Sequence, residues 1–358
     1  MNYALRCKQC GIEYASSFEK QTCERCGGIL EVIYHEKQGE ARKLTYAKGF
    51  WDFEPLLPNG KYKHFAVGMT KIVPSNDNDN LFFKFEFDNP THSFKDRGSV
   101  IEVAKAKEYG FDKIACASTG NMAYSISYYA KLYGIEATVF ISKGANRDKL
   151  IDIKSTHDAE LHLINGDFTA AQKEAERYAQ RNDAFLGGDY CYRKEGQSTI
   201  AYELFLQARD AKNIIVPVGN ATLFTALYKA YTRMKTAGLI STMPRLFGVE
   251  ASGCSPLYKA AKNATEIKYE KPKTFADAIA VGFPTYGSEA IEAARLSKGE
   301  FITVSDKEMR SSQQEIYKEY GVKVELASAA GLEAYEKLCK RNTIGKEQTV
   351  IILSGSNI

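Results

Sequence analysis

From Leu81 onward, short apolar runs alternate with longer segments whose apolar residues recur at helical spacing. The apolar runs predict strands at Lys113–Ser118, Glu136–Ser142, Glu160–Asn165, Asn213–Val218, Leu246–Glu250, Phe301–Ser305 and Thr349–Leu353. The segments between them predict helices, among them Ala123–Leu132, Thr169–Arg181, Leu223–Lys235 and Lys307–Tyr320, the last opened by a capping box at Ser305 and Glu308. This alternation favours an α/β fold in which parallel sheets carry helices on both faces. Ligands of such folds bind at the carboxyl ends of strands, so the turns from strand to helix are candidate sites.

One such junction holds a lysine in an unusual neighbourhood. A β-favouring run at Leu81–Phe87 leads into it, and a helical pattern at Ser99–Tyr109, closed by Gly110, leads out. Between them, Lys95 stands between an aromatic residue and an Asp-Arg pair. Such surroundings could desolvate the amine and lower its pKa, as an imine-forming nucleophile requires. The residues alone leave this reading and a plain solvated lysine about equally supported.

Two further strand-to-helix turns suit an anion. The turn at Ala117–Met122 has free backbone N–H groups and hydroxyls that could hold a carboxylate. The turn at Val216–Leu223 could seat a phosphate on its backbone N–H groups. Either can also be an ordinary capped turn.

The N-terminal segment carries four of the eight cysteines in two Cys-x-x-Cys pairs. They are Cys7, Cys10, Cys23 and Cys26. Four thiolates spaced in this way can surround one zinc ion tetrahedrally. Two unrelated pairs or a redox dithiol are the alternatives, but a redox motif needs only one pair. With all four positions filled by sulfur the zinc would be structural.

Composition narrows the class of protein. The chain has 358 residues, which suggests two ordinary domains or one large domain with an appendage. A hydrophobic content of 44% can fill a substantial core, and the net charge of +4 comes from interspersed charges. The small net charge and the mixing of acidic with basic residues argue against a surface dedicated to nucleic acid or membrane. No apolar run approaches the roughly 20 residues that span a bilayer, and the N-terminus lacks a signal-peptide pattern, so we expect a cytoplasmic protein.

The stretch Asn89–Gly98, Asn-Pro-Thr-His-Ser-Phe-Lys-Asp-Arg-Gly, resembles the signature of threonine synthases, which are fold type II, tryptophan-synthase-like pyridoxal phosphate enzymes. Other stretches resemble that family in the same order along the chain: Ser118–Asn121, Tyr192–Thr199, Pro217–Asn220, Glu325–Ala330 and Leu353–Ser356. Some family members also carry a similar N-terminal ribbon. The chain departs from the pattern at His92, where Gly is common, and at Gly187-Gly188, where many members have Asn-Ser.

The resemblance implies a role for each matching residue. It implies that Lys95 holds the cofactor as a Schiff base and acts as the catalytic acid and base. For the cofactor it further implies contacts by Asn121 with the pyridoxal 3′-oxygen, by Gly219, Asn220, Ala221, Thr222 and Leu223 with the phosphate, and by Ser354 with the pyridine nitrogen. For the substrate it implies carboxylate binding by Ser118 and Thr119, and phosphate binding by Arg193 and Lys149.

We therefore expect two doubly wound parallel-sheet domains of the fold type II kind and a small zinc ribbon. The predicted boundaries are 1–36 for the ribbon, 37–98 with 185–358 for the large domain that binds pyridoxal 5′-phosphate, and 99–184 for the small domain. The predicted activity is conversion of O-phosphohomoserine and water to L-threonine and phosphate, in a homodimer. A β-replacement enzyme using O-phosphoserine, similar to cysteate synthase, is the alternative enzyme. A catalytically silent zinc-ribbon protein that binds a ligand or partner is the alternative outside enzymes. The role of His92 and any effector stay open.

Overall fold

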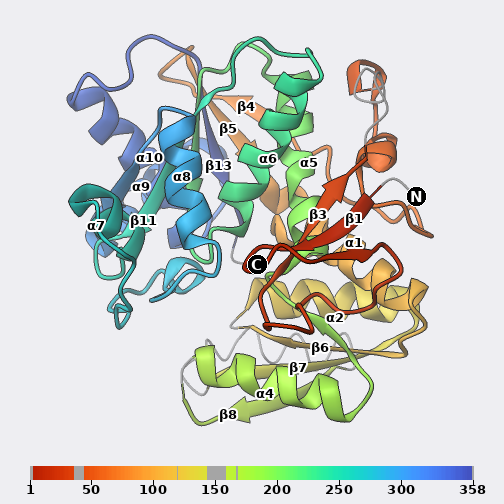
Figure 1. The fold of residues 1–358 in the computed structure, drawn as a ribbon. Coiled ribbons are helices and arrows are strands. Elements are labelled where there is room, and N and C mark those ends of the chain that lie inside the picture. Colours follow the sequence, from red (N-terminus) through yellow and green to blue (C-terminus); the bar gives the residue numbers. More distant parts are fainter. Residues whose placement is uncertain (1–2, 36–43, 119, 143–158, 167, 357–358) are drawn as a thin grey trace. The chain divides into compact units, whose positions relative to one another are not determined.

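The computed structural model describes residues 3–35, 44–118, 120–142, 159–166 and 168–356 (Figure 1). Its contacts divide the chain into two compact units. Unit 1 comprises Met1–Val67 and Lys95–Gln197, and unit 2 comprises Gly68–Phe94 and Ser198–Ile358. Each unit is built on a parallel sheet, which confirms the predicted α/β class. The three-part division into a ribbon, a large domain and a small domain stays a prediction.

Unit 1 opens with a small antiparallel sheet. Its strands are β1 (Tyr3–Cys7), β2 (Glu13–Ala15) and β3 (Leu30–Tyr34), in the order β2-β1-β3. A 3₁₀ helix, η2 (Phe50–Leu56), follows. The short strands bury Tyr3, Leu5, Leu30 and Val32 in the same core as the helices of unit 1, so the ribbon packs on a larger body within that unit.

The main sheet of unit 1 has four parallel strands in the order β8-β7-β6-β9. They are β6 (Lys113–Ala117), β7 (Glu136–Ser142), β8 (Glu160–Ile164) and β9 (Phe185–Gly187). The helices are α1 (Lys95–Glu108), α2 (Asn121–Tyr133), α4 (Phe168–Arg181) and α5 (Cys191–Gln207), whose last turns belong to unit 2. Successive residues of β6 point to opposite faces: Ile114 and Cys116 join the core that holds α1 and α2, and Ala115 and Ala117 join the core under α4. Figure 1 shows α2 and α4 on the two sides of this sheet.

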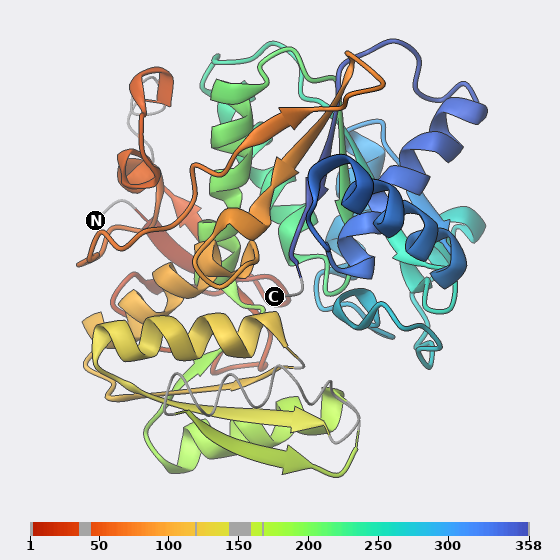
Figure 2. The same ribbon diagram turned by 180° about the vertical axis from the view of Figure 1, so that it is seen from behind.

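Unit 2 has a six-stranded sheet in the order β12-β11-β10-β13-β5-β4, parallel except for the edge strand β4. The strands are β4 (Ile72–Pro74), β5 (Leu81–Phe85), β10 (Asn213–Pro217), β11 (Arg245–Ala251), β12 (Phe301–Val304) and β13 (Thr349–Leu353). The helices are η3 (Glu86–Asp88), α6 (Thr222–Thr236), α7 (Pro256–Asn263), η4 (Asp277–Ile279), α8 (Gly287–Leu296), α9 (Asp306–Tyr320) and α10 (Leu326–Lys340). Helices α6 and α8 cover one face and α9 and α10 the other, as the opposite views in Figures 1 and 2 show.

The predicted strands and helices lie within about two residues of the observed ones, and the capping box of Ser305 and Glu308 is confirmed. The largest difference is at α1, which begins at Lys95 and not at Ser99. Its polar first turn reads as a loop in sequence, but Asp96 and Arg97 are fully buried. The antiparallel strand β4 was not predicted. None of the described helices combines the length and the apolarity that a membrane crossing requires.

Candidate active site

Lys95 is the first residue of α1, in unit 1, and is partly exposed. Its backbone carbonyl accepts a hydrogen bond of 3.4 Å from Nη1 of Arg193. The next residue, Asp96, accepts a hydrogen bond of 2.6 Å from the hydroxyl of Ser125 on α2. The turn that carries the candidate nucleophile is therefore held from α5 and from α2.

Arg193 lies in the interior of unit 1. Its Nη2 contacts Oε2 of Glu102 at 2.6 Å and the hydroxyl of Ser99 at 3.1 Å, and its Nε donates to the carbonyl of Gly188 at 2.9 Å. Both charged side chains are 0% exposed. Burial raises the pKa of Glu102, and Arg193 and the amide of Gly188 oppose that rise. The predicted grip of Arg193 on a substrate phosphate stays a prediction, and that phosphate would compete with an internal carboxylate.

The turn after β6 leads into α2. The hydroxyl of Ser118 accepts hydrogen bonds from the amides of Gly120 at 3.3 Å and Ala123 at 3.0 Å, so it caps the helix from within the turn. Asn121 is the first residue of α2. Two predicted substrate residues, Thr119 and Lys149, lie outside the described residues.

In unit 2 the strand order places the carboxyl ends of β10, β13 and β5 side by side. Ser354 follows β13, and its carbonyl accepts a hydrogen bond of 3.0 Å from the amide of Phe94, the residue before Lys95. The hydroxyl of Ser354 lies 3.1 Å from that of Ser328 on α10. Ser328 also donates to the carbonyl of Gly355 at 2.7 Å and accepts from its amide at 2.9 Å.

The predicted phosphate turn follows β10 at the same edge. A side chain at Gly219 would meet the carbonyl of Ala278 at 2.7 Å, so only glycine fits there. Ala221 adopts a left-handed conformation, with φ at 64°, just before α6, and its methyl group cannot cap the helix. The first N–H groups of a helix have no intrahelical acceptor and attract anions. Asn220 instead accepts hydrogen bonds from the amide and hydroxyl of Thr285 at 3.3 and 3.2 Å, which anchors the turn.

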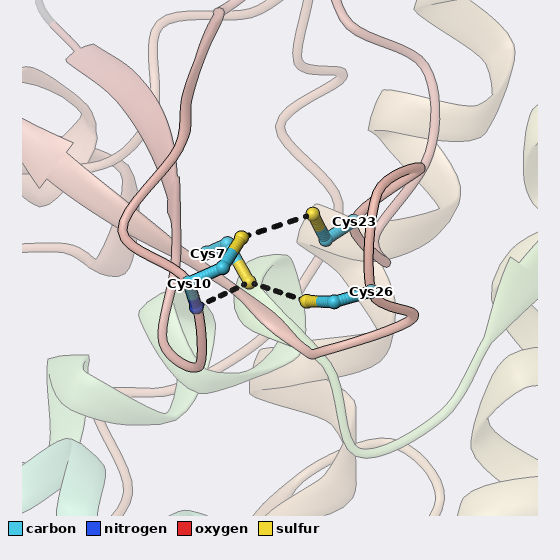
Figure 3. Close-up of side chains that lie close together, drawn as sticks. All are labelled: Cys7, Cys10, Cys23 and Cys26. Atoms are coloured by element: carbon cyan, nitrogen blue, oxygen red, sulfur yellow. Dashed lines mark hydrogen bonds between the residues drawn. The ribbon is translucent and has the colours of Figure 1, made fainter.

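The four N-terminal cysteines converge in unit 1 (Figure 3). Their sulfur atoms all lie within 4.8 Å of one another. The Cys7–Cys26 pair is 3.5 Å apart and the Cys10–Cys23 pair 3.6 Å, close to the roughly 3.8 Å between ligands of tetrahedral zinc at 2.3 Å. A hydrogen bond of 3.1 Å with the hydroxyl of Tyr14 lowers the pKa of Cys23 to about 6, which favours the thiolate. The donor set fits a closed, structural metal site.

Known proteins resemble this chain in sequence and in fold. The profile of a family described as pyridoxal-phosphate dependent enzyme matches residues 64–355. A threonine synthase of Methanosarcina acetivorans is 32% identical over 99% of this chain and 92% of its own length, and one of Methanocaldococcus jannaschii is 30% identical over 98% and 91%. The chain belongs to the threonine synthase family of pyridoxal-phosphate dependent enzymes. Among solved structures, maize serine racemase superimposes with a TM-score of 0.74 at 21% identity, covering 91% of this chain and 94% of that one, which shows the shared fold.

Sequence reasoning about this threonine synthase family member missed several residues. Ser328, which contacts Ser354, lies in the stretch Glu325–Ala330, but no role was predicted for it. Glu102, which pairs with Arg193, and Ser125, which holds Asp96 beside Lys95, carry no motif. Ser93, two residues before Lys95, is fully buried, and its hydroxyl has no hydrogen-bond partner among the described residues. A buried hydroxyl of this kind fits a polar ligand at the sheet edge of unit 2. His92, whose role stayed open, is an exposed turn residue with φ at 58°.

Proposed function

We propose that the chain is a threonine synthase that uses pyridoxal 5′-phosphate to convert O-phosphohomoserine and water to L-threonine and phosphate. The observation that carries the proposal is its membership of the family over nearly the whole chain, together with an intact lysine at Lys95. The reaction releases phosphate from Cγ and adds water at Cβ. The substrate would be a small phosphorylated amino acid.

When bound, the cofactor withdraws electrons and so stabilises negative charge beside Cα of the substrate. We assign the other tasks to this chain. Lys95 binds the cofactor aldehyde and moves protons at Cα and Cβ. The amides of Gly219, Asn220, Ala221, Thr222 and Leu223 grip the cofactor phosphate, while Asn121 and Ser354 bind the 3′-oxygen and the ring nitrogen. Ser118 and Thr119 bind the substrate carboxylate, and Lys149 and Arg193 are the candidates for its phosphate. Within the described part of the chain the Ser93 hydroxyl has no hydrogen-bond partner and Ala221 provides no side-chain cap for α6, and both observations support a ligand at the unit 2 sheet edge.

A product assay tests the proposal. The purified protein with pyridoxal phosphate should release phosphate and threonine in equal amounts from O-phosphohomoserine, and no cysteate from O-phosphoserine with sulfite. Borohydride reduction should attach the cofactor to the peptide that contains Lys95, and Lys95→Ala should lose both results. Lys20→Ala, an exposed change on the ribbon, is the control that should retain them. Cysteate without threonine would make the protein a β-replacement enzyme. Failure to attach the cofactor to Lys95 would favour a silent binding protein.

We further propose that Cys7, Cys10, Cys23 and Cys26 hold one structural zinc ion. Their sulfur spacing supports a closed site, as does the finding that the cluster contains four donors and no fifth among the residues that the structure describes. Metal analysis should give one zinc per chain, and Cys10→Ser should lower it without changing the fold class seen by circular dichroism. If the purified protein binds the cofactor but contains no zinc, the zinc site is refuted and the proposed activity is not.

We also propose a cytoplasmic homodimer. Light scattering on the holoprotein measures the assembly, and fractionation of cells that express it measures the location. A monomeric active enzyme would overturn the dimer.

A further inference from the structure

One ribbon side chain inserts into the interior of unit 1. Gln21 lies between the two cysteine pairs and is 2% exposed. Its amide nitrogen donates to the carbonyl of Leu186 at 2.7 Å and to Oε1 of Glu102 at 3.3 Å. Its amide oxygen accepts from the amide of Tyr192 at 3.4 Å and the thiol of Cys191 at 3.5 Å. Gln21 thus contacts α1, the end of β9 and the start of α5 at once.

The ribbon fold fixes Gln21 in place. Its backbone carbonyl accepts a hydrogen bond of 3.1 Å from the amide of Leu30, the first residue of β3. Thr22 pairs with Ile29 as an isolated bridge, and Cys23 follows. The loop that presents the amide is therefore the same loop that presents two of the four sulfurs.

From Glu102 the contacts lead back along α1 to its first residue. Oε1 of Glu102 receives the amide of Gly188 at 2.8 Å, and Oε2 pairs with Arg193. Arg193 then reaches the carbonyl of Lys95. It also packs directly on α1, because a side chain at Gly98 would meet Cγ of Arg193 at 2.6 Å. In an α-helix the carbonyl of Lys95 is also the acceptor for the amide of Ser99, so a shift of Arg193 disturbs the first helical hydrogen bond.

We propose that Gln21, Glu102 and Arg193 form a positioning relay through which the cysteine-bearing ribbon fixes the turn of Lys95. The contacts carry this inference: three segments distant in sequence meet in one buried polar network, and the side chains of Gln21, Glu102 and Arg193 are each at least 98% buried. The inference rests on the proposed function, in which Lys95 is the cofactor lysine. In this role the three residues position the lysine, and the role does not depend on the substrate-phosphate contact proposed for Arg193.

A second set of contacts provides the control. The hydroxyl of Tyr109 lies 2.6 Å from that of Tyr192 and donates to the carbonyl of Ser16 at 2.7 Å. Lys105 lies over the rings of Tyr3, Tyr109 and Tyr192. These contacts attach the ribbon at the far end of α1. Tyr109→Phe therefore loosens the ribbon without touching the turn of Lys95.

The experiment compares Gln21→Ala with Tyr109→Phe and Lys20→Ala in the full chain. Hydrogen exchange is followed at the amides of Ser99 to Ile101, with the strand β6 as the internal reference. Gln21→Ala should speed exchange at the start of α1 about tenfold, the effect of one lost buried hydrogen bond, and leave β6 within about twofold. Binding of free pyridoxal phosphate at Lys95, followed by absorbance, should weaken by a similar factor. Tyr109→Phe and Lys20→Ala should neither speed exchange at the start of α1 nor weaken binding of pyridoxal phosphate.

A double-mutant cycle sharpens the test. In a Glu102→Gln background, the added effect of Gln21→Ala on exchange at Ser99 should shrink well below its effect in the wild type. Equal exchange at the start of α1 in Gln21→Ala and Tyr109→Phe would overturn the relay, as would a uniform increase across unit 1 or full additivity in the cycle. The exchange readout needs neither cofactor nor turnover. If the wild-type protein makes threonine but Gln21→Ala does not speed exchange at the start of α1, the relay alone is refuted. If exchange speeds up as expected but the wild-type protein makes no threonine, the proposed function alone is refuted.

Discussion

The start of α1 in unit 1 and the carboxyl edge of the six-stranded sheet in unit 2 both carry predicted site residues, but they hold them differently. At α1, long charged and amide side chains from distant segments meet in the interior, with Arg193 and Glu102 at the centre. At the sheet edge, hydroxyls and backbone groups form the hydrogen bonds that hold the site residues, as Ser328 does with Ser354. Backbone groups are the same in every sequence, whereas each buried charge depends on one specific partner.

Two buried carboxylates make the contrast concrete. Glu102 has a cation, Arg193, as its partner at 2.6 Å. Glu250, in β11, accepts hydrogen bonds from the amides of Leu257 at 3.2 Å and Tyr258 at 2.7 Å at the start of α7. Burial raises the pKa of Glu250 to about 7, against which the two amides act. Removal of Glu102 is costly because it leaves Arg193 buried without a counter-charge. The raised pKa of Glu250 makes the free energy of unfolding depend on pH.

The largest effect should follow from breaking the pair in unit 1. Glu102→Ala leaves the guanidinium of Arg193 buried without a counter-charge, which should cost about 3–5 kcal/mol of unfolding free energy. The single tryptophan, Trp51, lies in unit 1, so its fluorescence during urea unfolding reports on that unit.

The double variant Glu102→Ala with Arg193→Met is the matched control. It removes both charges and should recover most of the loss, because an apolar replacement leaves no unpaired ion. If the double variant were as unstable as the single one, the cost would come from lost packing and the comparison between the regions would fail.

A pH effect should appear in unit 2. Between about pH 4.5 and 7 the folded protein keeps the proton of Glu250 and the unfolded chain gives it up, so stability falls as pH rises through this window. A difference of about 2.5 pKa units corresponds to on the order of 3 kcal/mol above pH 7. Glu250→Gln should flatten this contribution. Urea unfolding by far-UV circular dichroism at several pH values measures it, with Trp51 fluorescence as the record of unit 1. An unchanged slope in the variant would assign the pH dependence to other groups.

A smaller loss should follow at the sheet edge. Ser328→Ala removes the partner of the Ser354 hydroxyl and of the backbone of Gly355, which should cost about 1–2 kcal/mol. It should also weaken cofactor binding if Ser354 contacts the ring. Ser127→Ala is the control, since the described residues give that buried hydroxyl one hydrogen bond, to the carbonyl of Ala123 within α2. Equal cofactor affinity in both variants would remove Ser354 from the proposed site.

The same contrast explains what could be predicted from sequence. The strands β6, β10 and β13 are unbroken apolar runs, and the turns after them carry recognisable motifs, so local pattern was enough. The pair of Glu102 and Arg193 joins residues 91 positions apart. No local periodicity encodes such a contact, and each member alone reads as a surface charge on a helix.

The predicted start of α1, at Ser99, was wrong for a related reason. Lys95 to Gly98 is polar and contains glycine, which predicts a loop, yet Asp96 and Arg97 are buried. Gly98 is there because Arg193 packs against the position that a side chain would fill. Tertiary contacts override the local preference at this turn, so the helix start could be placed only once α5 was known.

The smallest predicted effect concerns His92, one residue from the Ser93 hydroxyl and exposed in a left-handed conformation. His92→Gly relieves a backbone cost of about 1–2 kcal/mol, of which about half is offset by the greater freedom of glycine in the unfolded chain. A gain of about 0.5 kcal/mol is expected, with cofactor affinity and turnover unchanged if the residue only shapes the turn. Asn342→Gly, exposed with φ at 57°, is the matched control, and it should gain less because asparagine tolerates this conformation. A loss of turnover in His92→Gly without a loss of stability would instead give the imidazole a part in the site.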